Sequence, residues 1–200
     1  MFNRVFSTTR DKKLTVLIGL DISSAFNTID HNILLRRLHG EFAITGTALA
    51  WLQSYISNCF QFVKLRRHSS PPVSCLSGVT QGSILGPILF AAYTSPIGDL
   101  IHSFGIHHHQ LADYTQVHLA LRSSDMQNGL PLLADCTDAV KQWYLVNGLL
   151  LSADKSEGIC LSTSSQLRAA ADTVTVAGTT LPVSEDIRSL GVIYRPAFDV

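Results

Sequence analysis

Charged side chains are scarce in this chain. Asp, Glu, Lys and Arg make up 15% of its 200 residues, whereas soluble domains carry about 25%. Hydrophobic residues reach 46%, so the chain has enough apolar surface to bury a core. A surface with so little charge is expected to be covered in part by a partner or by further chain. We therefore expect a single domain over residues 1–200, present as a fragment of a larger protein.

Long apolar runs and regular cysteine spacings are also lacking. No apolar run reaches the roughly 18 residues of a membrane helix, and the first ten residues do not form a secretion signal. Cys59, Cys75, Cys136 and Cys160 lie far apart without a Cys-x-x-Cys pair, which argues against a zinc cluster and a dense disulfide framework. The sequence predicts no membrane partner and a reducing, intracellular location in either nucleus or cytoplasm.

An overall excess of basic charge, typical of nucleic-acid-binding domains, is absent as well, since the net charge is zero and the pI is near 7.1. The charges are nevertheless unevenly distributed. Residues 1–70 contain nine Lys and Arg against four Asp and Glu, a balance of +5, whereas residues 71–200 contain six against eleven, a balance of −5. The two parts of the chain are expected to meet different electrostatic environments.

The first clear structural pattern is a continuous apolar run, residues 14–20, that ends in Asp21. Such a run predicts a strand buried on both faces whose carboxylate emerges at its end. Asp30 then stands where the N-cap of a helix is expected, and Gly40 where that helix ends. A second amphipathic helix is expected from about 47 to 57, and its Trp51, like Trp143 further on, is predicted to pack in the core.

The remaining chain alternates exposed, helical and strand-like patterns. Residues 60–72 are expected to form a hairpin or loop with a basic, proline-bearing end. Two strand-like runs within residues 106–121 lie on either side of Asp113 and Tyr114. Helices are expected over residues 83–93 and 131–146, and short antiparallel strands over 158–161, 173–177 and 190–194.

Asp21 and Asp113 are the candidate metal ligands. Phosphoryl transfer with two metal ions requires carboxylates that converge from separate strands, and each of these residues interrupts or ends a strand-like run. They stand 92 positions apart (113 − 21), which leaves room for helices that bring the two strands together. From spacing alone, a capping or turn role is the alternative for either residue.

A glycine-framed loop, residues 78–83 (GVTQGS), precedes an apolar helix pattern. Its glycines allow the backbone to approach a flat ligand, and the Gln81 amide can both donate and accept a hydrogen bond. The alternative is an ordinary glycine loop before a helix.

Taken together, these segments resemble the reverse transcriptases encoded by non-LTR (LINE-type) retrotransposons, in the same order and at the same spacing over nearly the whole chain. Residues 20–31 (LDISSAFNTIDH) resemble the family's motif A and residues 78–83 its motif B. Motifs C, D and E correspond to residues 111–116 (LADYTQ), 147–157 and 189–192.

The resemblance implies a role for each matched residue. Asp21 and Asp113 would bind Mg²⁺ in a two-metal site, Phe26 would exclude a ribose 2′-hydroxyl, and Lys155 would protonate the departing pyrophosphate. Gln81 and Gly82 would lie against the template and the incoming nucleotide.

The chain departs from the family at Tyr114, which stands where motif C has its second Asp. A phenol with a pKa near 10 is a poor Mg²⁺ ligand at neutral pH, so the resemblance predicts an inactive or barely active polymerase. Asn27 replaces the acidic residue that usually follows the Ala-Phe pair, a smaller change.

The implied fold is α+β: a right-hand polymerase palm with an antiparallel sheet backed by helices, partial fingers and no complete thumb. The implied partners are an RNA template, a DNA primer and deoxynucleotides.

Two alternatives remain open, a catalytically inactive nucleic-acid-binding module and a translated remnant without selected activity. In the former, Arg36-Arg37 and the cations Lys64, Arg66 and Arg67 would contact phosphates. The run His107–His109 is expected to be a solvated strand edge, because consecutive strand residues cannot converge on one metal ion.

Overall fold

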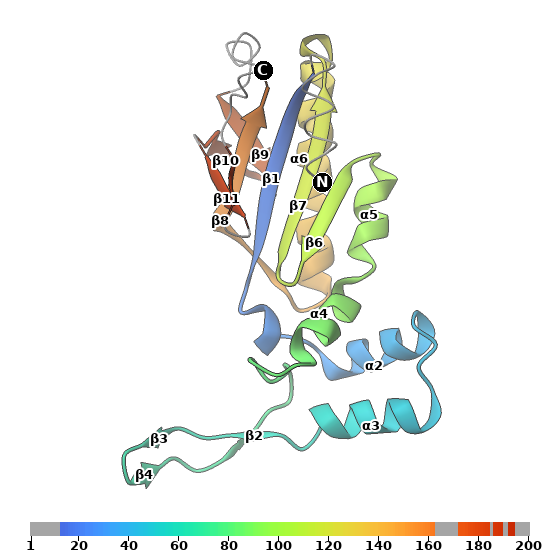
Figure 1. The fold of residues 1–200 in the computed structure, drawn as a ribbon, viewed down its shortest axis with the longest axis vertical. Coiled ribbons are helices and arrows are strands. Elements are labelled where there is room, and N and C mark those ends of the chain that lie inside the picture. Colours follow the sequence, from blue (N-terminus) through green and yellow to red (C-terminus); the bar gives the residue numbers. More distant parts are fainter. Residues whose placement is uncertain (1–12, 163–171, 185, 190–191, 195–200) are drawn as a thin grey trace. The chain divides into compact units, whose positions relative to one another are not determined.

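The computed structural model describes residues 13–162, 172–184, 186–189 and 192–194. The chain divides into two compact units (Figure 1). We call Met1–Ser23, Pro96–Leu145 and Leu150–Val200 the sheet unit, and Ser24–Ser95 with Val146–Leu149 the helical unit. Within the described ranges, no helix has both the length and the apolar character needed to cross a membrane.

The sheet unit is built on a four-stranded antiparallel sheet of order β6-β7-β1-β8. The central strand β1 (Leu14–Ser23) is buried over its first seven residues, as its unbroken apolar run predicts. The other strands of the sheet come from much later in the chain: β6 (His107–Leu111), β7 (Tyr114–Leu121) and β8 (Leu150–Leu161). Of these, β7 and β8 flank β1 directly.

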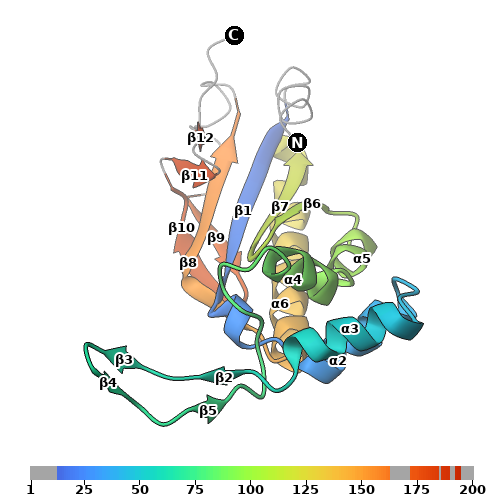
Figure 2. The same ribbon diagram turned by 60° about the horizontal axis from the view of Figure 1, so that its bottom comes forward.

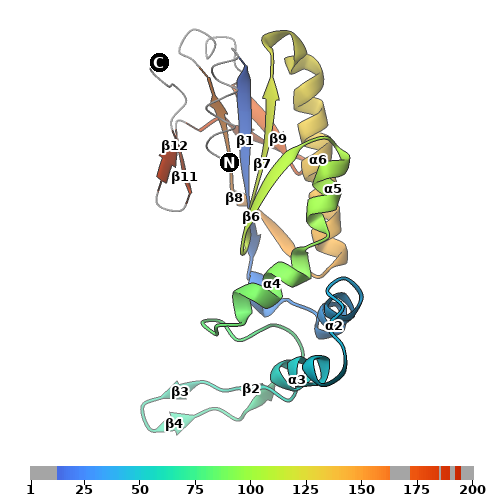
Figure 3. The ribbon, with the colours of Figure 1, turned by 45° about the vertical axis from the view of Figure 1, so that its right-hand side comes forward.

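Helix α6 (Met126–Val146) lies against one face of this sheet (Figure 3). The buried Thr115 hydroxyl of β7 is 3.1 Å from the Tyr144 hydroxyl of α6, which ties the helix to that face. On the opposite face, Leu17 forms an apolar cluster with Ile159, Leu161 and Ile187. Because side chains alternate along a strand, Leu17, Gly19 and Asp21 all point to this second face.

Smaller elements complete the sheet unit. The hairpin β9–β10 is anchored on α6, since the Thr137 hydroxyl accepts the Ala177 N–H at 3.0 Å and Lys141 Nζ donates to the Ala177 carbonyl at 2.9 Å. The remaining bounds are α5 Ile97–Ser103, the 3₁₀ turn η2 Ser123–Asp125, β9 Thr173–Val176, β10 Thr179–Pro182, β11 Ile187–Ser189 and β12 Val192–Tyr194. Strands β11 and β12 form an antiparallel pair, where a single strand over 190–194 was predicted; Leu190 and Gly191 of the motif E match lie outside the described residues.

The helical unit carries three helices and a long hairpin (Figure 2). As predicted, Asp30 caps α2 (His31–Gly40), accepting the Ile33 N–H at 2.9 Å. The other bounds are η1 Ala25–Asn27, α3 Gly46–Ile56, β2 Phe60–Gln61, β3 Lys64–Leu65, β4 His68–Ser69, β5 Val73–Ser74 and α4 Gly86–Thr94. Strand β2 pairs with β5, and β3 pairs with β4 at the hairpin tip.

Tyr93 is the central buried side chain of the helical unit. Its hydroxyl donates to the Asn147 carbonyl at 2.5 Å and accepts the Asp30 N–H at 3.4 Å. The Arg37 guanidinium lies 4.8 Å from the centre of the Tyr93 ring and donates to the Asn147 side chain. The phosphate role suggested for Arg37 is therefore wrong, because its charge is committed to internal contacts.

Two local predictions also differ from the structure. Trp51 is 57% exposed, because α3 buries only Ile56 among its residues, so its apolar face is not part of the core. Helix α6 begins at Met126 rather than near Pro131. Gly129 lies close to Leu121 in the turn before Pro131, since a Cβ there would lie 2.4 Å from Leu121 Cδ1. Pro131 inside the helix removes one backbone hydrogen bond.

Candidate active site

Asp21 lies near the end of β1, between the two strands that flank it. In the sheet register it is opposite Tyr114 of β7 and Ser152 of β8. Asp113 occupies the turn between β6 and β7, directly before Tyr114, so both carboxylates belong to the same end of the sheet. The structure thus brings together the two residues that the sequence singled out.

The turn that carries Asp113 has an unusual backbone. Ala112 adopts a φ of 49°, a left-handed conformation that costs a residue with a Cβ about 1–2 kcal/mol. Strain of this kind persists only where the surrounding structure enforces it, and it often occurs at functional sites. Here the paired strands β6 and β7 enforce it, and the turn presents Asp113 at the sheet end.

The Tyr114 side chain covers the backbone of β1 close to Asp21. A Cβ built on Gly19 would lie 1.9 Å from the Tyr114 hydroxyl oxygen and 2.7 Å from the ring carbon that bears it. Because Gly19 and Asp21 are two positions apart on β1, they share a face of the sheet. The phenol therefore lies over the β1 backbone on the face that bears Asp21, a placement that only glycine at position 19 permits.

Lys155 supplies the positive charge of the site. Its Nζ is 3.8 Å from Asp21 Oδ1, and the lysine side chain is 67% exposed. The pairing of β1 with β8 shifts register between Gly19 and Asp21, and this irregularity holds Lys155. The Ser156 hydroxyl donates to the Ser152 carbonyl at 2.9 Å across it.

Burial dominates the electrostatics of Asp21. It raises the pKa of the Asp21 carboxyl, Lys155 opposes the rise, and the neighbouring Asp113 carboxylate adds to it. The Asp113 carboxylate, in the turn that joins β6 and β7 at the same end of the sheet, disfavours the charged form of Asp21. Such an arrangement favours a bound cation between them.

The donor set fits one Mg²⁺ ion better than two. Mg²⁺ is commonly held by one or two carboxylates together with waters and substrate phosphates, and Asp21 with Asp113 meets that need. A second ion would require a further anionic donor at position 114, where the phenol is neutral. Among the residues that the structure describes, no three His, Cys, Asp or Glu side chains are grouped as a metal site.

The residues predicted to contact the nucleotide lie in the helical unit, on two loops that are joined by backbone hydrogen bonds. The Val79 N–H donates to the Phe26 carbonyl and the Gly78 N–H to the Ile29 carbonyl, both at 2.8 Å. Gly78 has a φ of 87°, and a Cβ there would lie 2.9 Å from the Asn27 carbonyl oxygen. This glycine is therefore needed for the two loops to meet.

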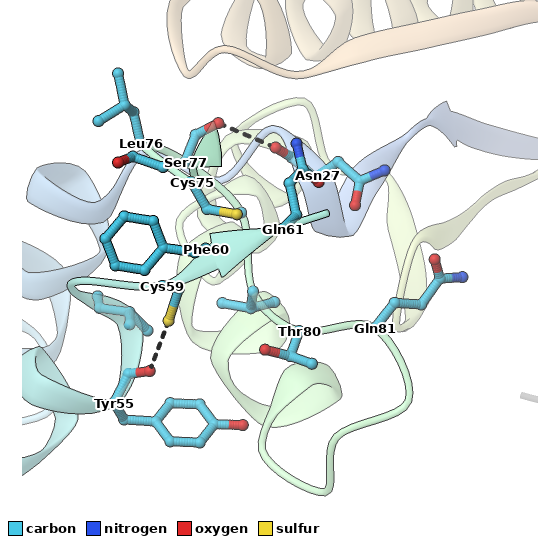
Figure 4. Close-up of a pocket in the computed structure, with 14 residues that line it drawn as sticks. Asn27, Tyr55, Cys59, Phe60, Gln61, Cys75, Leu76, Ser77, Thr80 and Gln81 are labelled. Carbon is cyan, nitrogen blue, oxygen red and sulfur yellow. Dashed lines mark hydrogen bonds between the residues drawn. The ribbon is translucent and has the colours of Figure 1, made fainter. Parts of the chain in front are cut away.

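Phe26 packs on the helix that follows the second loop. Its ring centre is 5.3 Å from that of the buried Phe90 in α4. Gln81 and Gly82 are exposed, and Gly82 has a φ of 81° with open space where a Cβ would be. Gln81 also lines a cavity of about 600 Å³ (Figure 4). The residues predicted to bind nucleotide are thus accessible within their unit.

Sequence reasoning missed two features of this site. It did not identify Gly19 as the position that accommodates Tyr114, nor the ion pair between Lys155 and Asp21. A glycine inside an otherwise continuous apolar strand was the available signal. The histidine run lies on the edge strand β6 with His107 and His109 exposed, as predicted.

Three comparisons with known proteins bear on this geometry. The model of the family "Reverse transcriptase (RNA-dependent DNA polymerase)" matches residues 3–194. A "Probable RNA-directed DNA polymerase from transposon BS" of Drosophila melanogaster is 29% identical over 87 residues, which are 44% of this chain and 9% of that protein.

Solved telomerase structures share the fold. Apo telomerase from Candida tropicalis, truncated from its C-terminal domain, superposes with a TM-score of 0.61 at 13% identity, over 96% of this chain and 39% of that one. Telomerase from Candida albicans, in complex with a fragment of telomeric RNA, gives a TM-score of 0.60 at 12% identity, over 96% and 34%. The chain therefore spans well under half the length of these relatives.

Proposed function

Because the chain belongs to the reverse transcriptase (RNA-dependent DNA polymerase) family, we propose that it is the palm portion of a retrotransposon-type, non-LTR RNA-directed DNA polymerase whose metal site is impaired. The observation that carries this proposal is the placement of Asp21 and Asp113 at the same end of an antiparallel sheet, with Tyr114 directly opposite Asp21 in the register. Since the chain spans only 9% of its transposon relative, the activity of a whole protein is part of the proposal.

In this proposal Asp21 and Asp113 hold Mg²⁺. When bound, the ion supplies positive charge that stabilises the transferring phosphoryl group. The chain's own residues hold Asp21 on β1 and Asp113 in the turn between β6 and β7, and they keep Lys155 Nζ 3.8 Å from Asp21 Oδ1. With a neutral phenol at position 114, the site lacks the charge for a second ion, which costs about 10³-fold in rate.

The remaining predicted residues act on the substrates. Phe26 excludes a ribose 2′-hydroxyl, Gln81 and Gly82 contact the template and the incoming deoxynucleotide, and Lys155 donates a proton to the departing pyrophosphate. The support for these roles is their motif position together with the exposure of Gln81, Gly82 and Lys155. An RNA template and a DNA primer complete the proposed set of partners.

Primer extension on an RNA template tests the proposal. We expect weak Mg²⁺-dependent incorporation by the wild-type chain, its loss in Asp113→Ala, and a large gain in Tyr114→Asp. Incorporation that does not fall in Asp113→Ala would reject the assigned metal ligands. Tyr114→Asp combined with Asp113→Ala is the matched control, because it keeps the number of carboxylates while moving one of them.

A second candidate function is nucleic-acid binding without catalysis. The observation that favours it is the hairpin tip in the helical unit, where Lys64 of β3 and the turn residues Arg66 and Arg67 are all exposed. Arg66 has a φ of 55°, so the turn holds these cations outward at a cost in backbone strain. This candidate predicts binding that weakens steeply with salt.

A further inference from the structure

Cys59 and Cys75 lie at opposed backbone positions at the neck of the hairpin in the helical unit. In the ladder between β2 and β5, Phe60 is opposite Ser74 and Gln61 is opposite Val73. The same register, continued by one step, places Cys59 opposite Cys75. A backbone hydrogen bond from the Cys75 N–H to the Cys59 carbonyl, at 2.8 Å, shows that the pairing does continue.

Residues paired in this way are at the right separation for a disulfide. Directly opposed, hydrogen-bonded residues of an antiparallel pair have Cα atoms roughly 5.5 Å apart, and disulfides span Cα separations of roughly 4.4–6.8 Å. Opposed side chains also point to the same face of the ladder. Both cysteines are half-buried and line the same cavity (Figure 4).

The thiols are free in this structure, and one of them is turned aside. Cys59 Sγ donates weakly to the Tyr55 carbonyl at 3.6 Å and to the Ser57 carbonyl at 3.7 Å. Rotation about the Cα–Cβ bond to another staggered rotamer would release these hydrogen bonds and direct the sulfur toward Cys75. Opposed hydrogen-bonded residues have Cβ atoms roughly 5.5 Å apart, whereas a disulfide requires roughly 3.5–4.5 Å, so the ladder must also narrow for the bond to form.

We propose that Cys59 and Cys75 are a redox modification site that forms a reversible disulfide by exchange with a low-molecular-weight disulfide. The Cys75 thiolate attacks one sulfur of the small disulfide, giving a mixed disulfide and one released thiolate. The Cys59 thiolate then attacks Cys75 Sγ and displaces the second small thiolate. The two cysteine sulfurs lose two electrons in total, and the small disulfide gains them as two thiols, which take up the two protons.

Cys136 and Cys160 are unsuited to the same reaction. Both are buried in the sheet unit, and burial raises the pKa of each thiol to about 11. The reactive thiolate is therefore scarce at neutral pH, and its access is blocked. They serve as internal controls for the more accessible pair.

A disulfide between Cys59 and Cys75 would restrain the neck of the hairpin that carries the basic tip. The neck is otherwise held by strands of two residues each, and isolated two-stranded ribbons are only marginally stable. A covalent link at 59–75 would fix the neck, whereas reduction would free it. This inference is independent of polymerase activity, because it rests on the cysteine register alone.

The test is disulfide mapping of the folded chain in glutathione buffers of increasing oxidised fraction. After alkylation of free thiols, trypsin cuts after Lys64, Arg66 and Arg67, so peptides 38–64 and 68–122 stay joined only through a 59–75 bond. We expect this joined species in wild type, its disappearance on reduction, and alkylation of Cys136 and Cys160 only after denaturation.

The matched control moves one cysteine by a single position. The double variant Cys75→Ser with Ser74→Cys keeps the cysteine count but turns the thiol to the other face of the strand. We expect at least about tenfold less cross-link in this variant, since its effective thiol concentration at Cys59 falls. Equal cross-linking in the two proteins, a link that forms only in urea, or no link at the most oxidising ratio would each overturn the proposal. Circular dichroism establishes that both proteins are folded.

Discussion

Tyr114 and Gly19 are coupled, because the tyrosine ring occupies the space that a side chain at position 19 would need. A methyl group on Gly19 would meet the Tyr114 hydroxyl at 1.9 Å, so Gly19→Ala forces the ring off the β1 backbone. We expect this substitution to lower the free energy of unfolding by about 1–3 kcal/mol, the usual cost of overpacking. In a Tyr114→Ala background, the same change should cost much less.

Urea unfolding of the four proteins in this double-mutant cycle measures the coupling. Additive effects of Gly19→Ala and Tyr114→Ala would show that the ring does not lie over Gly19. The cycle thus tests the placement of the phenol without any assay of activity.

Asp21 is a residue whose ionisation opposes folding. Its pKa is raised in the folded chain, chiefly by burial, so the folded state binds the proton more tightly than the unfolded state does. The stability that this carboxyl contributes is present at low pH and is lost as pH rises through its raised pKa. Asp21→Asn, which stays neutral, should therefore be more stable than wild type at pH 7.

Thermal unfolding as a function of pH checks this expectation. The advantage of Asp21→Asn should shrink as pH falls through the raised pKa and vanish once the wild-type carboxyl is protonated. A constant difference across that range would contradict the assigned cause. Loss of the ion pair with Lys155 in this variant should change its stability little, because the lysine side chain is largely exposed and exposed ion pairs contribute little to stability.

The elements of the helical unit are held together by Tyr93. Its hydroxyl in α4 bonds the Asn147 carbonyl and the N-cap residue of α2. Tyr93→Phe should lower the free energy of unfolding by about 1–3 kcal/mol, because the buried Asn147 carbonyl would lose this donor. Tyr55→Phe on α3 is a suitable control, because the hydroxyl of that half-buried tyrosine makes no hydrogen bond within the described part of this unit. Equal stability of Tyr93→Phe and wild type in urea would show that the bond contributes nothing.

Elements with a complete local signal were predicted well from the sequence. The apolar run of β1, the Asp30 cap of α2 and the turn at Asp113 each depend on a few neighbouring residues. The burial of α3 was not predictable, because the apolar periodicity around Trp51 says nothing about which surface covers it. Helix α5 has only seven residues, which is too short for a helical periodicity of apolar residues to be recognised in the sequence.

Family motifs identify the candidate residues of the site, whereas the neighbours of each side chain depend on the register of the strands. The match to the reverse transcriptase family and the telomerase-like fold confirm the predicted family and fold class. The position of Tyr114 over Gly19 follows from the pairing of β1 with β7, which no linear pattern reveals. The single-domain assignment of residues 1–200 stays a prediction.

At the scale of the whole molecule, the uneven charge distribution predicts where nucleic acid binds. Neutralising Arg66 and Arg67 together, as Arg66→Gln with Arg67→Gln, should reduce the slope of log affinity against log salt by about 0.7–0.9 for each phosphate that these side chains neutralise. Arg122→Gln, which removes an exposed cation of the sheet unit, is the control and should leave the slope nearly unchanged. Fluorescence anisotropy with a labelled RNA–DNA duplex gives both slopes. Binding that is independent of salt would exclude the hairpin as a phosphate-binding element.

Asp21 and Asp113 form the proposed cation site, in which Tyr114 stands where the family has a third carboxylate. Its most direct measurement is Mn²⁺ binding, followed by electron paramagnetic resonance of the free ion, since Mn²⁺ takes the same oxygen ligands as Mg²⁺. We predict that Tyr114→Asp binds Mn²⁺ about tenfold or more tightly than wild type, and that adding Asp113→Ala abolishes the gain. Equal affinity of wild type and Tyr114→Asp, or a gain that survives Asp113→Ala, would contradict the account.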